Sequence, residues 1–128
     1  MSELIKLNYS VVIPTHNRID FLENAIRSVF QQSILPYEIF VVDDLGLSKV
    51  RELLENLSSE FSFNIEYIIS TSKNGVSHSY NLGASKAKGE YLAFLDDDDF
   101  WSKDYIFNVG KVIVEKNIDI ILTRLTAF

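Results

Sequence analysis

Four consecutive carboxylates at Asp96, Asp97, Asp98 and Asp99, here called the acidic cluster, form the strongest chemical signal in this sequence. Two such charges about 5 Å apart repel each other by roughly 3 kcal/mol at an effective dielectric constant near 20. The cluster therefore needs water, protons or a cation. Its hard oxygen ligands suit Mg²⁺ or Mn²⁺, which are typically held by one or two carboxylates and by substrate phosphate oxygens. We predict a divalent-cation site here; a solvated acidic turn that caps the next helix is the alternative, above all for Asp99.

Two further polar segments also follow short apolar runs. Residues 14–18 read PTHNR, and their backbone N–H groups stand ahead of an amphipathic stretch, where they can bind a base edge or an anion. Asp43 and Asp44 end another apolar run, and one of these carboxylates can accept a hydrogen bond from a ring N–H of a bound base. Ordinary turn chemistry is the alternative for both segments. With no second imidazole nearby in the sequence, His16 is expected to be a loop residue and not a metal ligand.

Hydrophobic periodicity predicts the elements that must position these side chains. Runs rich in β-branched and aromatic residues predict strands at 10–13, 38–42, 65–69, 91–95 and 118–122. Helical spacing of apolar residues predicts helices at 20–32, 48–57, 77–88 and 102–116. Asp20 is the expected N-cap of the first helix, and Gly89 is the expected C′ glycine of the third. This alternation favours an α/β fold with a mostly parallel sheet flanked by helices. Ligands bind such sheets at the carboxyl ends of the strands, where all three polar segments fall.

Composition excludes several classes of protein. With 128 residues, the chain is expected to form a single domain over 1–128. It has no cysteine, which excludes disulfide scaffolds, zinc–thiolate sites and thiol nucleophiles. A net charge of −6 without a basic run disfavours a nucleic-acid partner. No apolar run is long enough to span a membrane and no signal peptide is visible, so we expect a cytoplasmic location, with peripheral contact at the inner face of the membrane as an alternative.

The polar segments together, in this order and spacing, resemble the GT-A glycosyltransferases of family 2. The likeness rests on residues 11–18 (VVIPTHNR), 41–44 (VVDD), 88–91 (KGEY) and 94–101 (FLDDDDFW), and it covers the chain from Ser10 to about Asp104. It implies the Rossmann-like nucleotide-diphospho-sugar transferase fold, in its nucleotide-binding half. The sequence departs from the family at Leu45-Gly46, where Gly-Ser is usual, and at Tyr80, where an arginine is common.

The resemblance also implies a set of site residues. A nucleotide-diphospho-sugar, most often a UDP-sugar, would be the donor, and Asp44 would accept a hydrogen bond from its base. Asp98 would be the main ligand of Mn²⁺ or Mg²⁺ in a DXD motif, with Asp96 supporting it and Asp97 near the ribose and sugar. The other donor-binding residues would be Pro14, Thr15, Asn17 and Asn81.

The implied reaction is transfer of a hexosyl group to an acceptor hydroxyl with inversion. The acceptor would be a saccharide or a lipid-linked acceptor. The general base would lie in an acceptor-binding half that follows the family's donor half and is expected to be missing here, so no catalytic residue is expected within this chain. Two alternatives stay open: a module that binds the nucleotide-sugar without turnover, and self-association through exposed apolar surface. A phosphoacceptor receiver domain is disfavoured, because the first strand leads to Pro14 and Thr15 instead of paired acids.

Overall fold

The computed structural model describes residues 6–70 and 75–123. Strands and helices alternate along the chain, as the periodicity predicts, up to the end of the last helix. The elements are β1 (Tyr9–Thr15), α1 (Ile19–Phe30), β2 (Glu38–Asp43), α2 (Ser48–Phe61), β3 (Ile65–Ile69), α3 (Val76–Lys86), β4 (Tyr91–Phe94) and α4 (Tyr105–Lys116).

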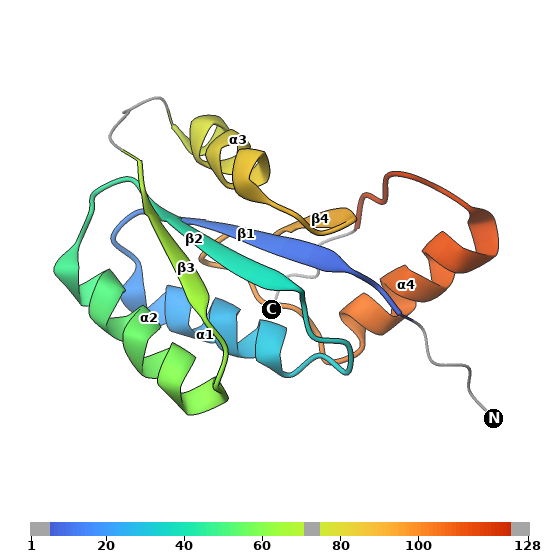
Figure 1. The fold of residues 1–128 in the computed structure, drawn as a ribbon, viewed down its shortest axis with the longest axis horizontal. Coiled ribbons are helices and arrows are strands. Elements are labelled where there is room, and N and C mark those ends of the chain that lie inside the picture. Colours follow the sequence, from blue (N-terminus) through green and yellow to red (C-terminus); the bar gives the residue numbers. More distant parts are fainter. Residues whose placement is uncertain (1–5, 71–74, 124–128) are drawn as a thin grey trace.

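The described strands form one parallel sheet in the order β3-β2-β1-β4. Helices α1 and α2 cover one face of this sheet and α3 covers the other (Figure 1). Every residue of β1 is buried, because this central strand has a neighbouring strand on each side and helices on both faces. The α/β fold with a parallel sheet flanked by helices is therefore confirmed.

The two faces of the sheet have separate apolar cores. The larger core joins alternate residues of β1 and β2 to the inner sides of α1 and α2, and it includes Trp101 and Ile106. The smaller core places Val12, Phe40 and Val42 under α3. Gly83 allows α3 to come this close, because a Cβ atom at that position would lie 2.4 Å from a methyl carbon of Val12. Gly83 thus serves the close packing of α3 on the sheet.

Three predictions about the elements are wrong. Residues 118–122 form no strand and pair with no described strand, and the side chains of Ile120 and Leu122 are 79% and 93% exposed. Their β-prone sequence is not enough, because a strand is stable only when its backbone is hydrogen-bonded to a neighbour. Asp20 lies inside the first turn of α1, whose N-cap residue is Arg18. Gly89 is not a C′ glycine, because α3 ends at Lys86; it lies against the β1 backbone instead.

The register of the sheet brings the polar segments to one edge. Thr15 at the end of β1 pairs with Asp43 at the end of β2. On the other side of β1, Val12 pairs with Phe94, the last residue of β4, so the acidic cluster begins beside the end of β1. All three polar segments therefore meet at the carboxyl edge of the sheet. Among the described residues, no helix is long and apolar enough to cross a membrane.

Candidate functional site

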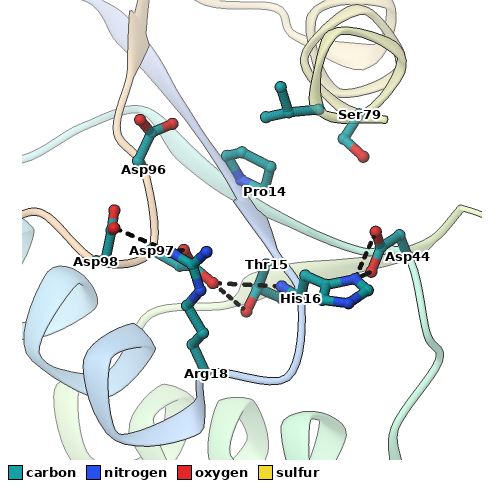
Figure 2. Close-up of a pocket in the computed structure, with 10 residues that line it drawn as sticks. Pro14, Thr15, His16, Arg18, Asp44, Ser79, Asp96, Asp97 and Asp98 are labelled. Atoms are coloured by element: carbon teal, nitrogen blue, oxygen red, sulfur yellow. Dashed lines mark hydrogen bonds and ion pairs between the residues drawn. The ribbon is translucent and has the colours of Figure 1, made fainter. Parts of the chain in front are cut away.

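A pocket of about 400 Å³ opens at the carboxyl edge of the sheet. Figure 2 shows it between the ends of β1, β2 and β4 and the first turns of α3. The lining residues are Pro14, Thr15, His16, Arg18, Asp44, Val76, Ser79, Asp96, Asp97 and Asp98. The volume is in the range of small-molecule binding sites. Residues from all three predicted polar segments therefore share one cavity.

Asp97 ties the acidic cluster to the end of β1. Its carboxylate is buried, and its Oδ2 atom accepts hydrogen bonds from the Thr15 hydroxyl at 3.0 Å and from the His16 backbone N–H at 3.3 Å. A buried carboxylate needs such donors, because an unpaired charge would be strongly destabilising. Asp97 therefore fixes the position of the cluster, and its carboxylate faces β1.

The chain that follows the cluster is fixed to α1 and to the turn after α1. The backbone N–H of Trp101 donates to the Ser28 hydroxyl at 3.0 Å, and the Gln32 side chain accepts from the Ile106 N–H at 3.0 Å. Ser28 and Gln32 are both buried. The segment that carries Asp98 and Asp99 is thus anchored on both sides, which limits the entropy lost when a ligand binds there.

The two aspartates at the end of β2 have different environments. Asp43 is fully buried and accepts hydrogen bonds from the N–H groups of Leu45 and Leu47 and from the Tyr67 hydroxyl at 2.7 Å. Burial, followed by the bond to Asp43, raises the pKa of the Tyr67 hydroxyl above its ordinary value. Asp43 thus performs the predicted turn chemistry, and Asp44 is the aspartate that lines the pocket.

Sequence reasoning missed the partner of Asp44. The Nδ1 atom of His16 lies 2.8 Å and 2.9 Å from the two oxygens of the Asp44 carboxylate. The imidazole is 65% exposed, so it lies over the carboxylate at the mouth of the pocket. His16 is a loop residue, as predicted, but it is also a contact of the carboxylate that is expected to bind the base.

Arg18 is a second contact that sequence reasoning missed. Its Nη1 atom lies 2.9 Å from Oδ2 of Asp98 and 3.5 Å from Oδ1 of Asp97. The side chains of Arg18 and Asp98 are each 48% exposed, so water weakens this ion pair. The sequence signal was the presence of this basic residue at the end of the polar segment 14–18. Spacing along the sequence does not show which carboxylate it contacts.

Three members of the acidic cluster are arranged as a cation site would require. One carboxylate oxygen from each of Asp96, Asp98 and Asp99 lies within 4.8 Å of the others. Three hard, partly hydrated oxygen ligands with room for water or phosphate fit Mg²⁺ or Mn²⁺. The predicted metal residues Asp96 and Asp98 are both in this group, and Asp99 joins them. Asp96 also accepts a hydrogen bond from the hydroxyl of Tyr80, the position at which the sequence resemblance leads us to expect an arginine.

Burial, followed by repulsion between neighbouring carboxylates, raises the pKa of two members of the acidic cluster. Burial raises the pKa of Asp96 above its ordinary value of 3.8, and the charges of Asp99, Asp98 and Asp97 raise it further. Burial also raises the pKa of Asp99, with additional effects from Asp98 and Asp97. A carboxylate with a raised pKa is stabilised by a proton or a cation, so the cluster favours binding of either.

The Asp96→Asn variant is expected to be more stable than the parent chain without metal, by an amount that grows as the pH rises. A raised pKa means that the folded parent binds the proton more tightly than the unfolded chain. The unfolding free energy of the parent therefore falls as the pH rises from about 3.8 through the raised pKa of Asp96. The asparagine variant does not show this fall, because asparagine does not ionise. Urea unfolding in EDTA between about pH 4 and about pH 7 measures the difference. The exposed Asp119→Asn variant is the control, and a difference independent of pH would contradict the prediction.

Two residues assigned to donor binding do not line the pocket. Asn17 is exposed, has a positive φ of 52°, and lies in the turn between β1 and α1. Asn81 is exposed on α3. Their roles stay predictions. Pro14, Thr15, Asp44, Asp96, Asp97 and Asp98 all line the cavity, as their assignment requires.

Comparison with known sequences gives the family. The model of glycosyl transferase family 2 matches residues 10–128, which include every polar segment of the pocket. The chain belongs to glycosyl transferase family 2. This membership also removes the receiver-domain alternative.

Several curated relatives carry glycosyltransferase names. TuaG of Bacillus subtilis is 30% identical over 119 residues, which are 93% of this chain and 44% of the relative. The GalNAc(5)-diNAcBac-PP-undecaprenol beta-1,3-glucosyltransferase of Campylobacter jejuni is 37% identical over 91 residues, 70% of this chain and 29% of the relative. The chain thus spans less than half the length of these family 2 relatives.

Solved structures support the fold. TarS 1-349 of Staphylococcus aureus in complex with UDP-GlcNAc superimposes with a TM-score of 0.75 at 23% identity, over 87% of this chain and 32% of TarS. The mannosyltransferase PcManGT of Pyrobaculum calidifontis, in complex with GDP-Man and Mn²⁺, superimposes with a TM-score of 0.74 at 20% identity. The match covers 84% of this chain and 32% of PcManGT. The predicted GT-A fold is confirmed by this likeness.

Proposed function

We propose that this chain binds the nucleotide-diphospho-sugar donor, a UDP-sugar, of a metal-dependent glycosyltransferase. The observation that carries the proposal is the shared pocket, which is lined by Asp44 just after β2 and by three members of the acidic cluster after β4, Asp96, Asp97 and Asp98. The complexes of TarS with UDP-GlcNAc and of PcManGT with GDP-Man and Mn²⁺ support it. A cation is needed because carboxylates alone would repel a diphosphate.

The acidic cluster is the proposed binding site for the cation, Mn²⁺ or Mg²⁺. Asp98 is the main ligand and Asp96 supports it. When bound, such an ion stabilises the negative charge that develops on a departing nucleoside diphosphate. Asp97 contributes by holding the loop against β1 through Thr15 and His16. Its proposed place near the ribose and sugar is what the resemblance to family 2 implies.

The base of the donor is assigned to the opposite side of the pocket. Pro14 and Thr15 form its wall at the end of β1, and the Asp44 carboxylate accepts a hydrogen bond from a ring N–H of the base. Asn17 and Asn81 complete the proposed set. The contact between His16 and Asp44 must loosen or rearrange when a base takes one of the two carboxylate oxygens.

The complete reaction is transfer of a hexosyl group to a hydroxyl of a saccharide or lipid-linked acceptor. The acceptor oxygen forms a bond to the anomeric carbon with inversion, the bond to the diphosphate breaks, and the hydroxyl proton goes to a general base. We assign no residue of this chain as that base. From these 128 residues we therefore expect donor binding with little or no transfer. A cytoplasmic location stays a prediction from the sequence.

Isothermal titration of the chain with UDP-GlcNAc tests the proposal. We expect binding in the presence of Mn²⁺ and at least about tenfold weaker binding in EDTA, because the diphosphate then meets unscreened carboxylates. Titration with GDP-mannose under the same conditions tests the choice of base. If neither nucleotide binds the folded chain with or without Mn²⁺, the proposed function is wrong.

A further inference from the structure

Arg18 is the permanent cation of the pocket. Of the pocket's lining residues, all of them in the described part of the chain, no other is an arginine or a lysine, whereas four are aspartates. The Nη1 atom of Arg18 lies between two of these aspartates, 2.9 Å from Asp98 and 3.5 Å from Asp97. The guanidinium thus compensates part of the negative charge that the acidic cluster concentrates at the end of β4.

The carboxylate that Arg18 binds is also needed by the proposed cation. Asp98 belongs to the group whose oxygens lie within 4.8 Å of one another, together with Asp96 and Asp99. An ion held by this group would lie close to the guanidinium and would be repelled by it. The ion pair with Arg18 and the coordination of a divalent ion therefore compete for Asp98.

The surroundings of Arg18 allow its side chain to leave Asp98. The side chain is 48% exposed and extends from the turn between β1 and α1. Asp97 keeps its hydrogen bonds from Thr15 and from the His16 backbone when Arg18 moves away, so no buried carboxylate is left unpaired. The Arg18 backbone oxygen accepts from the Leu22 N–H at 2.8 Å, which holds the start of α1 independently of the side chain.

We infer that Arg18 is an internal counter-cation that competes with the divalent ion for Asp98 and, once displaced, pairs with the diphosphate of the donor. This inference rests on the proposed function. It makes the binding of the ion and of the diphosphate cooperative, because the ion frees the guanidinium and the diphosphate gives it a new anionic partner. Coupling between two ligands is reciprocal, so the nucleotide must tighten the binding of the ion by the same factor by which the ion tightens the binding of the nucleotide.

Titration of Mn²⁺ into the parent chain and the Arg18→Gln variant, followed by electron paramagnetic resonance of the free ion, tests the inference. We expect Mn²⁺ alone to bind Arg18→Gln about fivefold more tightly, because an exposed ion pair no longer competes and one positive charge is gone. The factor by which UDP tightens Mn²⁺ binding is expected to fall by about the same fivefold. Low ionic strength keeps the interaction measurable.

Three further variants sharpen the experiment. Arg18→Lys keeps the positive charge and is expected to bind Mn²⁺ as the parent does. Lys111→Gln removes one charge from an exposed position on α4 that does not line the pocket, and it is also expected to match the parent. Arg18→Met removes the charge with a side chain of similar length, and it replaces Arg18→Gln if that variant loses its circular dichroism spectrum. It must show the same tighter binding.

The outcomes separate this inference from the proposed function. Equal or weaker Mn²⁺ binding by Arg18→Gln overturns the inference, and the proposed function stands if UDP still binds both chains. If neither Mn²⁺ nor UDP binds either chain, the inference and the proposed function are both wrong. Tighter Mn²⁺ binding with an unchanged effect of UDP overturns the coupling, because the freed guanidinium then has no part in holding the diphosphate.

Discussion

Replacement of Asp98 by asparagine is expected to weaken Mn²⁺-dependent binding of UDP-GlcNAc by about 100-fold. Asp98 is one of three carboxylates whose oxygens can share an ion, and the proposed site makes it the main ligand. Losses of 10- to 100-fold follow even from changes to residues that only orient a metal's ligands. The side chain is 48% exposed, so its removal is expected to leave the fold intact.

The matched control for this prediction is Asp119→Asn. Asp119 is exposed and lies outside the acidic cluster, so the variant loses the same charge without changing the site. Calorimetric titration of the three chains with UDP-GlcNAc, with Mn²⁺ and again in EDTA, gives the comparison. Equal Mn²⁺-dependent affinity of Asp98→Asn and the parent would contradict the role of Asp98.

The Gly83→Ala variant is expected to lose about 2 to 3 kcal/mol of unfolding free energy, as overpacking of a core does. A Cβ atom at this position would lie 2.4 Å from Cγ1 of Val12 and 3.1 Å from its Cγ2. Val12 is fully buried in the central strand and has a β-branched side chain with few rotamers, so it cannot move aside cheaply. The helix propensity gained with alanine, up to about 1 kcal/mol, is too small to offset the clash.

A double variant shows whether the clash is the cause. Val12→Ala removes the two methyl carbons that the new Cβ atom would meet, so Gly83→Ala is expected to cost at least about 1 kcal/mol less in the Val12→Ala background. Urea unfolding of the four chains measures this coupling. If the losses of unfolding free energy in the two single variants simply add in the double variant, the clash between residue 83 and Val12 is not the cause.

The sequence predicted the sheet and the meeting of the polar segments well, because both depend on local patterns. Continuous apolar runs marked the buried strands, and polar residues directly after the runs marked the carboxyl edge of the sheet. The strand order explains why the polar segments are neighbours. Because β1 lies between β2 and β4, the ends of these three strands bring together Thr15, Asp44 and the acidic cluster. No knowledge of side-chain conformation was needed for this conclusion.

Contacts between side chains of different loops could not be predicted. The ion pair of Arg18 with Asp98 and the bond of His16 to Asp44 join residues 80 and 28 positions apart, and each depends on a rotamer and on the course of a loop. The same limit explains Gly89. Its sequence context resembles a helix end, but its role is close contact with the backbone of β1, which only the tertiary structure reveals.

The predicted strand at 118–122 illustrates a different limit. Its composition is that of a strand, but pairing is a property of two segments, and this one has no described partner. Local propensity therefore predicted the type of segment correctly only where the sheet supplied a neighbour. All four described strands satisfy this condition, and the structure confirms the strands predicted at those places.

The most direct test of the central claim is a crystal structure of the chain with UDP and Mn²⁺, in which anomalous scattering locates the ion. We predict a manganese peak in contact with the Asp98 carboxylate, with the diphosphate on its other side and the uracil near Asp44. A peak elsewhere on the chain, or a nucleotide bound away from the carboxyl edge of β1, would contradict the claim that the acidic cluster holds a cation for a sugar donor.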